Sequence, residues 1–274
     1  MFSTLRITSN CNLRCLYCYS GSSRDKQAKD LSTAKIKSII DRLLSNKITH
    51  ITISGGEPFT RHDICEILSY SAKRTKTGIV SNGTLISKIM AKRLSKIELT
   101  NLMISLDGPQ DIHDILRGKN TYQRAQKGIS NCLGSRIPVG ISTTLTNINH
   151  KHITSIYNYL KENNINRWII ETLKPQGRSK SSNLQLTKEQ QQSVKKTLDR
   201  LLATEKNIKI SVFDCKNCCS AGTKTISVSP DGTVTPCAFM PDALCGNILK
   251  DPWGTIIPKV KEFQERGITC FQRC

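Results

Sequence analysis

Three cysteines near the N-terminus have the spacing of a cluster-binding loop. Cys11, Cys15 and Cys18 are separated by three and by two residues, so they share one tight loop. Thiolates are the usual ligands of iron–sulfur clusters, and three of them can hold three corners of a cubane [4Fe–4S] cluster. The fourth iron then stays open, as metal positions do in catalytic sites. A zinc knuckle and three packed thiols are the alternatives. A zinc knuckle would need a fourth ligand nearby, and the nearest histidine is His50.

A second group of candidate residues is Gly55, Gly56 and Glu57, which follow an apolar run. The two glycines lack Cβ atoms, so a ligand can approach the backbone closely. The carboxylate of Glu57 can accept hydrogen bonds from an ammonium group. A tight turn before a helix is the ordinary alternative for this segment.

Two further polar segments end later apolar runs. Ser81 and Asn82 precede one glycine, and Ser105 and Asp107 precede another. Asp107 can accept hydrogen bonds from sugar hydroxyls, although a capping aspartate in a turn is the default interpretation. Arg117, a little further on, can clamp a carboxylate or face water.

Alternating strands and helices must position these residues. Hydrophobic periodicity predicts six strands, each followed by a helix. Short loops between them imply parallel strands joined by right-handed crossovers. The strands are expected at 2–8, 48–54, 78–81, 102–106, 139–145 and 168–173, and the helices at 31–44, 62–72, 87–94, 122–132, 153–163 and 188–205. The candidate segments follow the first four strands, so we expect them at the C-terminal rim of a whole or partial α/β barrel.

In this order and on these strands, the segments resemble the radical SAM superfamily over about residues 1–205. The resemblance implies a partial (β/α)6 barrel of the TIM type. It also implies that Cys11, Cys15 and Cys18 bind a [4Fe–4S] cluster whose open iron chelates the amine and carboxylate of S-adenosylmethionine (SAM). One-electron reduction would then cleave SAM and release a 5′-deoxyadenosyl radical, which abstracts hydrogen from a substrate.

The same resemblance assigns the contacts with SAM. It gives Gly55, Gly56 and Glu57 to the methionyl amine, Ser105 and Arg117 to the carboxylate, Asp107 to the ribose, Tyr17 to the adenine, and Ser81 and Asn82 to the turn that borders the site. Each assignment is an expectation carried over from the family pattern.

The C-terminal part, 206–274, resembles the SPASM/twitch extension found in that family. A predicted hairpin over 225–229 and 233–236 leads to Cys237, and the spacing from Gly232 to Cys237 fits the extension's pattern. A full SPASM extension carries more cysteines after this point than Cys270 and Cys274, so one auxiliary [4Fe–4S] cluster is expected rather than two. The expected ligands are Cys219, Cys237, Cys270 and Cys274, with Cys215 as an alternative.

The C-terminal part contains more thiols than one cluster needs. Cys218 competes with Cys215 for a ligand position, and Cys245 is a further candidate for a free thiol. A free thiol beside the radical site could donate a hydrogen atom to a substrate radical, and Cys218 and Cys245 are the candidates for this role. A structural thiol or a ligand of a second, incomplete cluster are the alternatives.

Composition limits the class of protein. Twelve cysteines in 274 residues, with no signal peptide and no apolar run that could span a bilayer, favour cluster ligation in the cytoplasm over disulfides. The net charge of +20 is compatible with nucleic acid, an acidic peptide or an anionic small molecule. Aromatic residues make up only 5% of the chain, which disfavours a single-strand-binding surface.

The first functional prediction is an enzyme that modifies a peptide, most simply a ribosomally made precursor, by epimerisation, crosslinking or oxidation. The alternative substrate is a small molecule, as in radical SAM dehydrogenases and cofactor-building enzymes. A zinc-binding protein on nucleic acid is the alternative from another class. A flavodoxin- or ferredoxin-type electron donor is expected. Because the first strand begins almost at Met1, a separate protein could bind a leader peptide, or the enzyme could hold the substrate directly.

Overall fold

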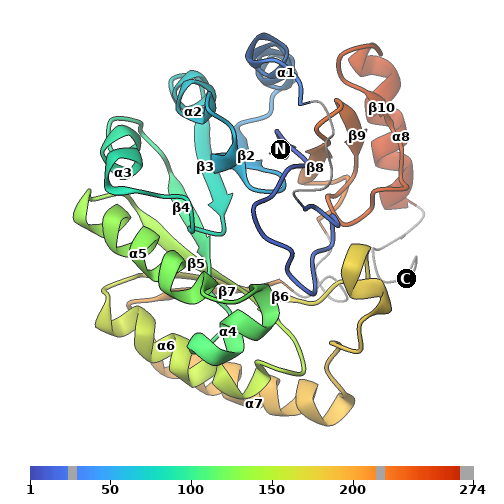
Figure 1. Cartoon of the computed structure of the whole chain (residues 1–274). Coiled ribbons are helices and arrows are strands. Elements are labelled where there is room, and N and C mark those ends of the chain that lie inside the picture. The colour runs from blue at the N-terminus through green and yellow to red at the C-terminus, as the bar shows by residue number, and fades with distance from the viewer. Residues whose placement is uncertain (24–29, 214–219, 266–274) are drawn as a thin grey trace.

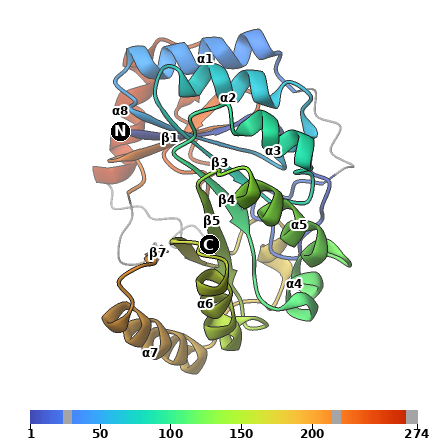
Figure 2. The ribbon, with the colours of Figure 1, turned by 90° about the vertical axis from the view of Figure 1, so that its left-hand side faces the viewer.

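The computed structural model describes residues 1–23, 30–213 and 220–265, and one curved sheet with helices on its outer side dominates the chain (Figure 1, Figure 2). The first seven strands are β1 (Phe2–Arg6), β2 (His50–Ser54), β3 (Lys76–Ser81), β4 (Asn101–Ser105), β5 (Val139–Leu145), β6 (Arg167–Thr172) and β7 (Lys209–Phe213). They are neighbours in this order, and each pair is parallel. The predicted α/β architecture with a parallel, barrel-type sheet is therefore confirmed.

Helices and short helical turns connect these strands. The helices are α1 (Thr33–Ser45), α2 (Ile64–Ala72), α3 (Lys88–Leu94), α4 (Gln110–Arg117), α5 (Thr121–Gly134), α6 (Ile153–Glu162) and α7 (Lys188–Thr204), and the 3₁₀ turns are η1 (Pro58–Thr60), η2 (His150–His152) and η3 (Gly177–Ser181). Local sequence signals start several of them: Ser32 and Ser87 accept hydrogen bonds from the first turns of α1 and α3. Fully buried Ile53, Ile79 and Ile141 represent the apolar core between sheet and helices.

Two elements of the barrel were not predicted. Helix α4 has only eight residues, fewer than the 11 to 18 or so over which helical periodicity is read. Strand β7 lies at the edge of the sheet, where Val212 and Phe213 are exposed, so it lacks the alternation that marks a half-buried strand.

The C-terminal part of the chain continues the barrel sheet. It contains β8 (Thr225–Val228), β9 (Thr233–Thr235), β10 (Gly246–Asn247) and helix α8 (Trp253–Glu265), and β8 and β9 form the predicted hairpin. Strand β8 pairs in parallel with β1, whereas β9 and β10 are antiparallel, and β10 and β7 end the ten-stranded sheet. The division into a barrel at 1–205 and an extension at 206–274 stays a prediction. Among the helices of the described segments, none has the length and apolar character needed to cross a membrane.

Candidate active site

A cavity opens at the C-terminal ends of the strands, where the barrel pattern predicts the site. Its empty volume, counted out to the open mouth, is about 950 Å³. The predicted residues on its wall are Cys11, Cys15, Tyr17, Cys18, Gly55, Gly56, Ser81, Asn82, Ser105 and Arg117. The fold therefore brings together all predicted SAM-site residues of the barrel except Glu57 and Asp107, which lie behind this wall.

The three thiols of the N-terminal loop fit a cubane cluster better than a single metal ion. Cys11, Cys15 and Cys18 are free, partly exposed and directed to the same cavity. Within the described ranges, no group of three His, Cys, Asp or Glu side chains could hold one metal ion. A cubane binds each thiolate at a different iron, so the three sulfurs need not converge on one point. Burial raises the pKa of Cys11 to about 12, so ligation must release its proton.

Gly55 and Gly56 let the end of β2 pack against the chain that follows β1. The Gly56 amide donates to Thr8 O at 2.8 Å, and a Cβ on Gly56 would lie 2.1 Å from Asn10 O. Gly55 has a φ of 149°, and a Cβ there would lie 2.6 Å from Thr8 O. The glycines are thus required by the contact between two backbones, in addition to lining the cavity.

We expect Gly56→Ala to destabilise the protein by about 3 kcal/mol or more, because the clash is with backbone and no side chain can rotate away. Urea unfolding of the purified variant measures this loss. Gly134→Ala is the matched control, since a Cβ there meets no atom within 4 Å. The control should be neutral or gain up to about 1 kcal/mol. Equal losses in both variants would contradict the role given to Gly56.

Glu57 connects the end of β2 to the end of β3. Its carboxylate is 1% exposed, and its Oε1 accepts hydrogen bonds from Ser81 Oγ at 2.9 Å and Phe59 N at 3.1 Å. Its Oε2 accepts from Asn82 N at 2.7 Å. The carboxylate is therefore bound to protein donors behind the cavity, and a direct contact with the methionyl amine stays a prediction. Burial raises the pKa of Glu57 to about 7.

This raised pKa predicts a pH-dependent stability. Between about pH 4.5 and 7 the folded protein keeps the proton that the unfolded chain loses, so the Glu57 contribution to the unfolding free energy falls as pH rises. The fall amounts to at most about 3 kcal/mol, at about 1.4 kcal/mol per pKa unit. Glu57→Gln removes this slope in urea unfolding between pH 5 and 8. The exposed Glu98→Gln is the control and should keep the wild-type slope. A Glu57→Gln variant with the wild-type slope would refute the assignment.

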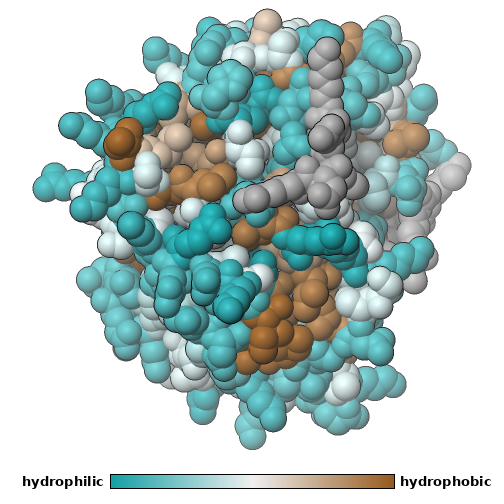
Figure 3. Space-filling model, viewed as in Figure 1, coloured by the Kyte–Doolittle hydropathy of each residue, from teal (hydrophilic) through white to brown (hydrophobic). Residues whose placement is uncertain are grey.

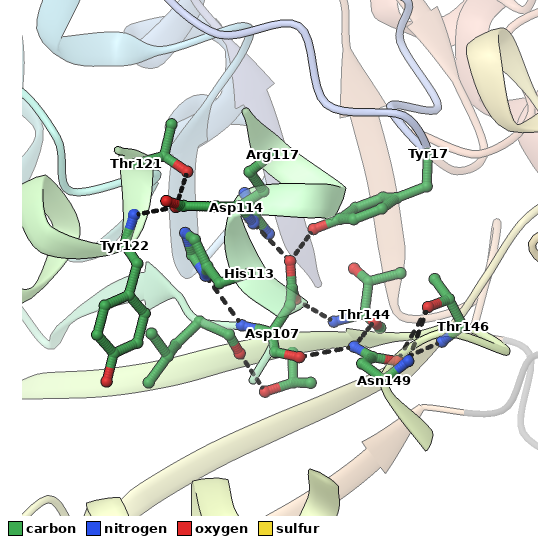
Figure 4. Close-up of polar contacts among 12 residues, drawn as sticks. Tyr17, Asp107, His113, Asp114, Arg117, Thr121, Tyr122, Thr144, Thr146 and Asn149 are labelled. Carbon is green, nitrogen blue, oxygen red and sulfur yellow. Dashed lines mark hydrogen bonds and ion pairs between the residues drawn. The ribbon is translucent and has the colours of Figure 1, made fainter. Parts of the chain in front are cut away.

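Asp107 is the centre of a buried hydrogen-bond network at the end of β4 (Figure 4). Its Oδ2 accepts from Arg117 Nε at 2.5 Å and from the Tyr17 hydroxyl, and its Oδ1 accepts from Thr144 N at 3.0 Å. Asp107 is 0% exposed, whereas Arg117 and Tyr17 line the cavity. Asp107 therefore lies behind the wall, where we interpret it as the residue that fixes Arg117 and Tyr17, and the expected ribose contact stays a prediction.

The charges in this network support that interpretation. Burial alone would raise the pKa of Asp107, but the Arg117 guanidinium holds it below its usual value, so the carboxylate stays ionised. His113 packs on the other side, where its Nδ1 accepts from the Asp107 amide at 3.3 Å. Burial, together with Arg117, lowers the pKa of His113 to about 4, so its ring is neutral near pH 7 and can accept this bond.

A small hydrophobic cluster packs α4 against the cysteine loop. Tyr17, Leu116 and Leu173 are buried in it, and Ile112 and Ile148 cover it in part. In the space-filling view an apolar area lies near α4, and the rest of this face is mostly hydrophilic (Figure 3). The cluster holds the Tyr17 ring in place, while its hydroxyl reaches Asp107.

One part of the cavity wall, which we call the β5–β6 wall, consists of residues that the sequence analysis did not select. They are Ser142 and Thr144 of β5, Glu171 and Thr172 of β6, and Leu173, Lys174 and Phe239. Lys174 is 4% exposed, and its Nζ donates to Thr172 Oγ1 at 2.8 Å and lies 5.9 Å from the Phe239 ring centre. Functional residues of α/β barrels lie at the C-terminal ends of the strands, so the ends of β5 and β6 could have been selected in the same way as the first four. Nothing in the sequence marks Phe239.

The auxiliary ligands are described only in part. Cys215, Cys218, Cys219, Cys270 and Cys274 lie outside the described residues. Cys237 is partly exposed, and two residues further on Phe239 packs edge-to-face on Tyr19, with ring centres 4.7 Å apart. The extension therefore contacts the N-terminal cysteine loop directly.

Cys245 does not line the cavity. Its thiol is 1% exposed and donates to Ala243 O at 3.5 Å, and burial raises its pKa to about 11. This placement matches a structural thiol and does not support hydrogen donation to a radical in the cavity.

Comparison with known proteins identifies the family. Residues 5–160 match the model of the radical SAM superfamily, which is more than half of the chain. The chain belongs to the radical SAM superfamily. Residues 218–274 match the SPASM iron-sulfur cluster-binding domain, so the predicted extension is confirmed. The radical SAM protein is accordingly an enzyme that uses a [4Fe–4S] cluster with SAM, and its SPASM domain implies auxiliary iron–sulfur binding.

Two curated relatives differ in what their names say. The radical SAM chain is 35% identical to Fe-coproporphyrin III synthase of Methanosarcina barkeri over 78% of its own length and 55% of that protein's length. It is 29% identical to the mycofactocin maturase MftC of Mycolicibacterium smegmatis, over 90% of its length and 67% of that protein's. The chain thus spans about half to two thirds of these relatives.

Solved structures share the fold at lower identity. Streptococcus suis SuiB bound to SAM has a TM-score of 0.78 at 17% identity, covering 92% of this chain and 64% of SuiB. The enzyme anSMEcpe with bound SAM has a TM-score of 0.80 at 22% identity, covering 96% of this chain and 82% of anSMEcpe. These likenesses support the partial barrel with a C-terminal extension.

Proposed function

We propose that this enzyme modifies a peptide substrate, which binds against the β5–β6 wall of the cavity. The observation that carries the proposal is the polar character of that wall. Ser142, Thr144 and Thr172 offer hydroxyl groups there, and Glu171 and Lys174 add a carboxylate and an ammonium group. Closely spaced donors and acceptors match the alternating N–H and C=O groups of a peptide.

The named relatives support the same substrate class. MftC is named as a maturase, and SuiB has been solved with its precursor peptide SuiA at a TM-score of 0.74. The anSMEcpe enzyme has also been solved with a bound peptide.

Within this proposal, the residues on the cysteine side bind the cofactor. The cluster and SAM supply reductive cleavage of the sulfonium when bound. Cys11, Cys15 and Cys18 hold the cluster, and Arg117 and Ser105 bind the carboxylate of SAM from the cavity wall. Tyr17 lines the wall beside Arg117, whose guanidinium carbon lies 5.3 Å from the ring centre, so the two side chains form one surface for the cofactor.

The extension supplies the auxiliary cluster in this proposal. Its ligands remain Cys219, Cys237, Cys270 and Cys274, with Cys215 as the alternative, and Cys218 remains a candidate hydrogen donor. A flavodoxin- or ferredoxin-type protein delivers the electron, and a separate protein binds the leader peptide.

Reconstituted enzyme tests the proposal. Under anaerobic conditions with SAM and dithionite, we expect 5′-deoxyadenosine and a mass change in a precursor peptide encoded beside this gene, read by mass spectrometry. An iron tetrapyrrole precursor, offered in a parallel reaction, should not be converted to Fe-coproporphyrin III. Conversion of the tetrapyrrole with no change in the peptide would reject a peptide substrate while leaving the radical chemistry intact.

A tetrapyrrole substrate is the second candidate, because the relative at 35% identity is named Fe-coproporphyrin III synthase. It fits the wall of the cavity less well. A planar macrocycle buries wide apolar faces, whereas on the β5–β6 wall Leu173 and Phe239 are apolar and the other five residues are polar or charged.

A further inference from the structure

The segment between β6 and α7 lies against the backbone of the cysteine loop. Within it, the Arg178 amide donates to Cys18 O at 3.0 Å. The guanidinium of Arg178 reaches across the loop, where Nε donates to Cys15 O at 2.8 Å and Nη2 donates to Ser22 O at 2.9 Å. Three donors of one residue thus bind three carbonyls of the segment that carries Cys15 and Cys18.

The backbone of this turn packs closely against the cysteine loop. Gly177 has a φ of 60°, and a Cβ on it would lie 2.4 Å from both Cys18 O and Tyr19 O. The turn itself is fixed by Ser179, which is fully buried and whose Oγ accepts from Gln176 N at 2.9 Å. The guanidinium is therefore held on a rigid turn, η3, rather than on a free loop.

The same turn reaches the C-terminal extension. The Gln176 side-chain amide donates to Phe239 O, and the Phe239 ring packs on Tyr19, the residue after Cys18. The turn η3 consequently joins the cysteine loop and the extension (Figure 1, yellow segment beside the dark-blue loop).

We propose that Arg178 is a positioning residue for the SAM cluster, which fixes the cysteine loop through its carbonyls and raises the reduction potential of the cluster with its charge. This goes beyond the proposed function, because it holds for any substrate and rests only on cluster binding by the N-terminal cysteines. Net charge and hydrogen bonding set the potentials of iron–sulfur clusters. A nearby cation stabilises the reduced form, which carries one more negative charge.

Replacing Arg178 with lysine and with glutamine separates the effect of its hydrogen bonds from the effect of its charge. A lysine keeps the positive charge but, as a point donor, cannot span two carbonyls as the guanidinium fork does. A glutamine removes the charge. The exposed Lys180 lies on the same turn and provides a matched control that also loses one charge.

The test uses reconstituted full-length R178Q, R178K and K180Q. Iron retention is measured in the presence of a chelator, and the cluster potential by an EPR-monitored titration, in which the response to added SAM identifies the SAM cluster. R178Q should lose iron several-fold faster, and its reduction equilibrium should shift about tenfold against reduction, which is about 59 mV more negative for one electron. R178K should lose iron faster at a nearly unchanged potential, and K180Q should match the wild type.

Other results overturn the proposal. Wild-type iron retention together with a wild-type cluster potential in R178Q would do so. A shift of the potential in K180Q as large as that in R178Q would also do so, because it would show that only the net charge of the protein matters. If R178Q does not fold, R178K decides, since wild-type iron retention in R178K would show that the guanidinium fork is not needed.

Discussion

Cys15→Ala is expected to remove the SAM cluster and with it the formation of 5′-deoxyadenosine. Cys15 is the middle ligand of the predicted set, and its thiol lines the cavity while its carbonyl is bound by Arg178. A cubane left with two protein thiolates loses its anchor, so about four irons per chain should be missing after reconstitution. SAM cleavage should fall toward the uncatalysed rate, a loss of about 10⁶-fold or more. Iron and sulfide counts and chromatography of the nucleoside measure both effects.

Cys132→Ala is the control for this result. Cys132 is fully buried in α5 and does not line the cavity, so its thiol is a packing group. The variant should keep its iron and its nucleoside production and lose only about 1 kcal/mol of stability. A Cys15→Ala protein that retains all its iron and still cleaves SAM would show that the N-terminal cysteines do not hold the cluster.

Asp107→Asn is expected to combine the largest loss of stability with a loss of SAM affinity. The substitution leaves the Arg117 guanidinium buried without its counterion, which typically costs about 3–5 kcal/mol. An asparagine cannot accept from Arg117, Tyr17 and Thr144 at once, because one of its two ends is a donor. Arg117 then loses its fixed position on the cavity wall. Urea unfolding measures the first effect, and calorimetric titration of the reconstituted protein with SAM measures the second.

The exposed Asp111→Asn on the same helix, α4, serves as the control and should change stability by less than about 0.5 kcal/mol. If Asp107→Asn binds SAM with unchanged affinity in protein that remains folded, Arg117 does not depend on Asp107. The result would then return Asp107 to a purely structural role at the end of β4.

The prediction of the fold succeeded where the signal is local. Buried strands such as β2 and β5 appear as apolar runs, and helices such as α1 and α7 carry both periodicity and a capping residue. It failed at α4 and β7, which are short or exposed. The parallel pairing of β8 with β1 joins residues more than two hundred positions apart, and no local pattern encodes such a contact.

The sequence by itself predicted the cluster-binding loop and the rim on which it lies, and the resemblance to the radical SAM superfamily implied SAM. The spacing of Cys11, Cys15 and Cys18 confines three thiols to one loop, and the order of strands places that loop beside Gly55 and Gly56. These are properties of chain connectivity, so they can be inferred before the chain is folded.

Only the tertiary structure decided what each side chain touches. It placed Asp107 behind Arg117 instead of in the cavity, because a buried carboxylate is stabilised by an adjacent guanidinium and backbone donors. It also brought Lys174 and Phe239 to one wall and laid Arg178 on the cysteine loop, from segments far apart in the sequence. Such contacts depend on the curvature of the sheet and on the packing of loops at its rim, and these follow from the whole chain rather than from any one segment of it.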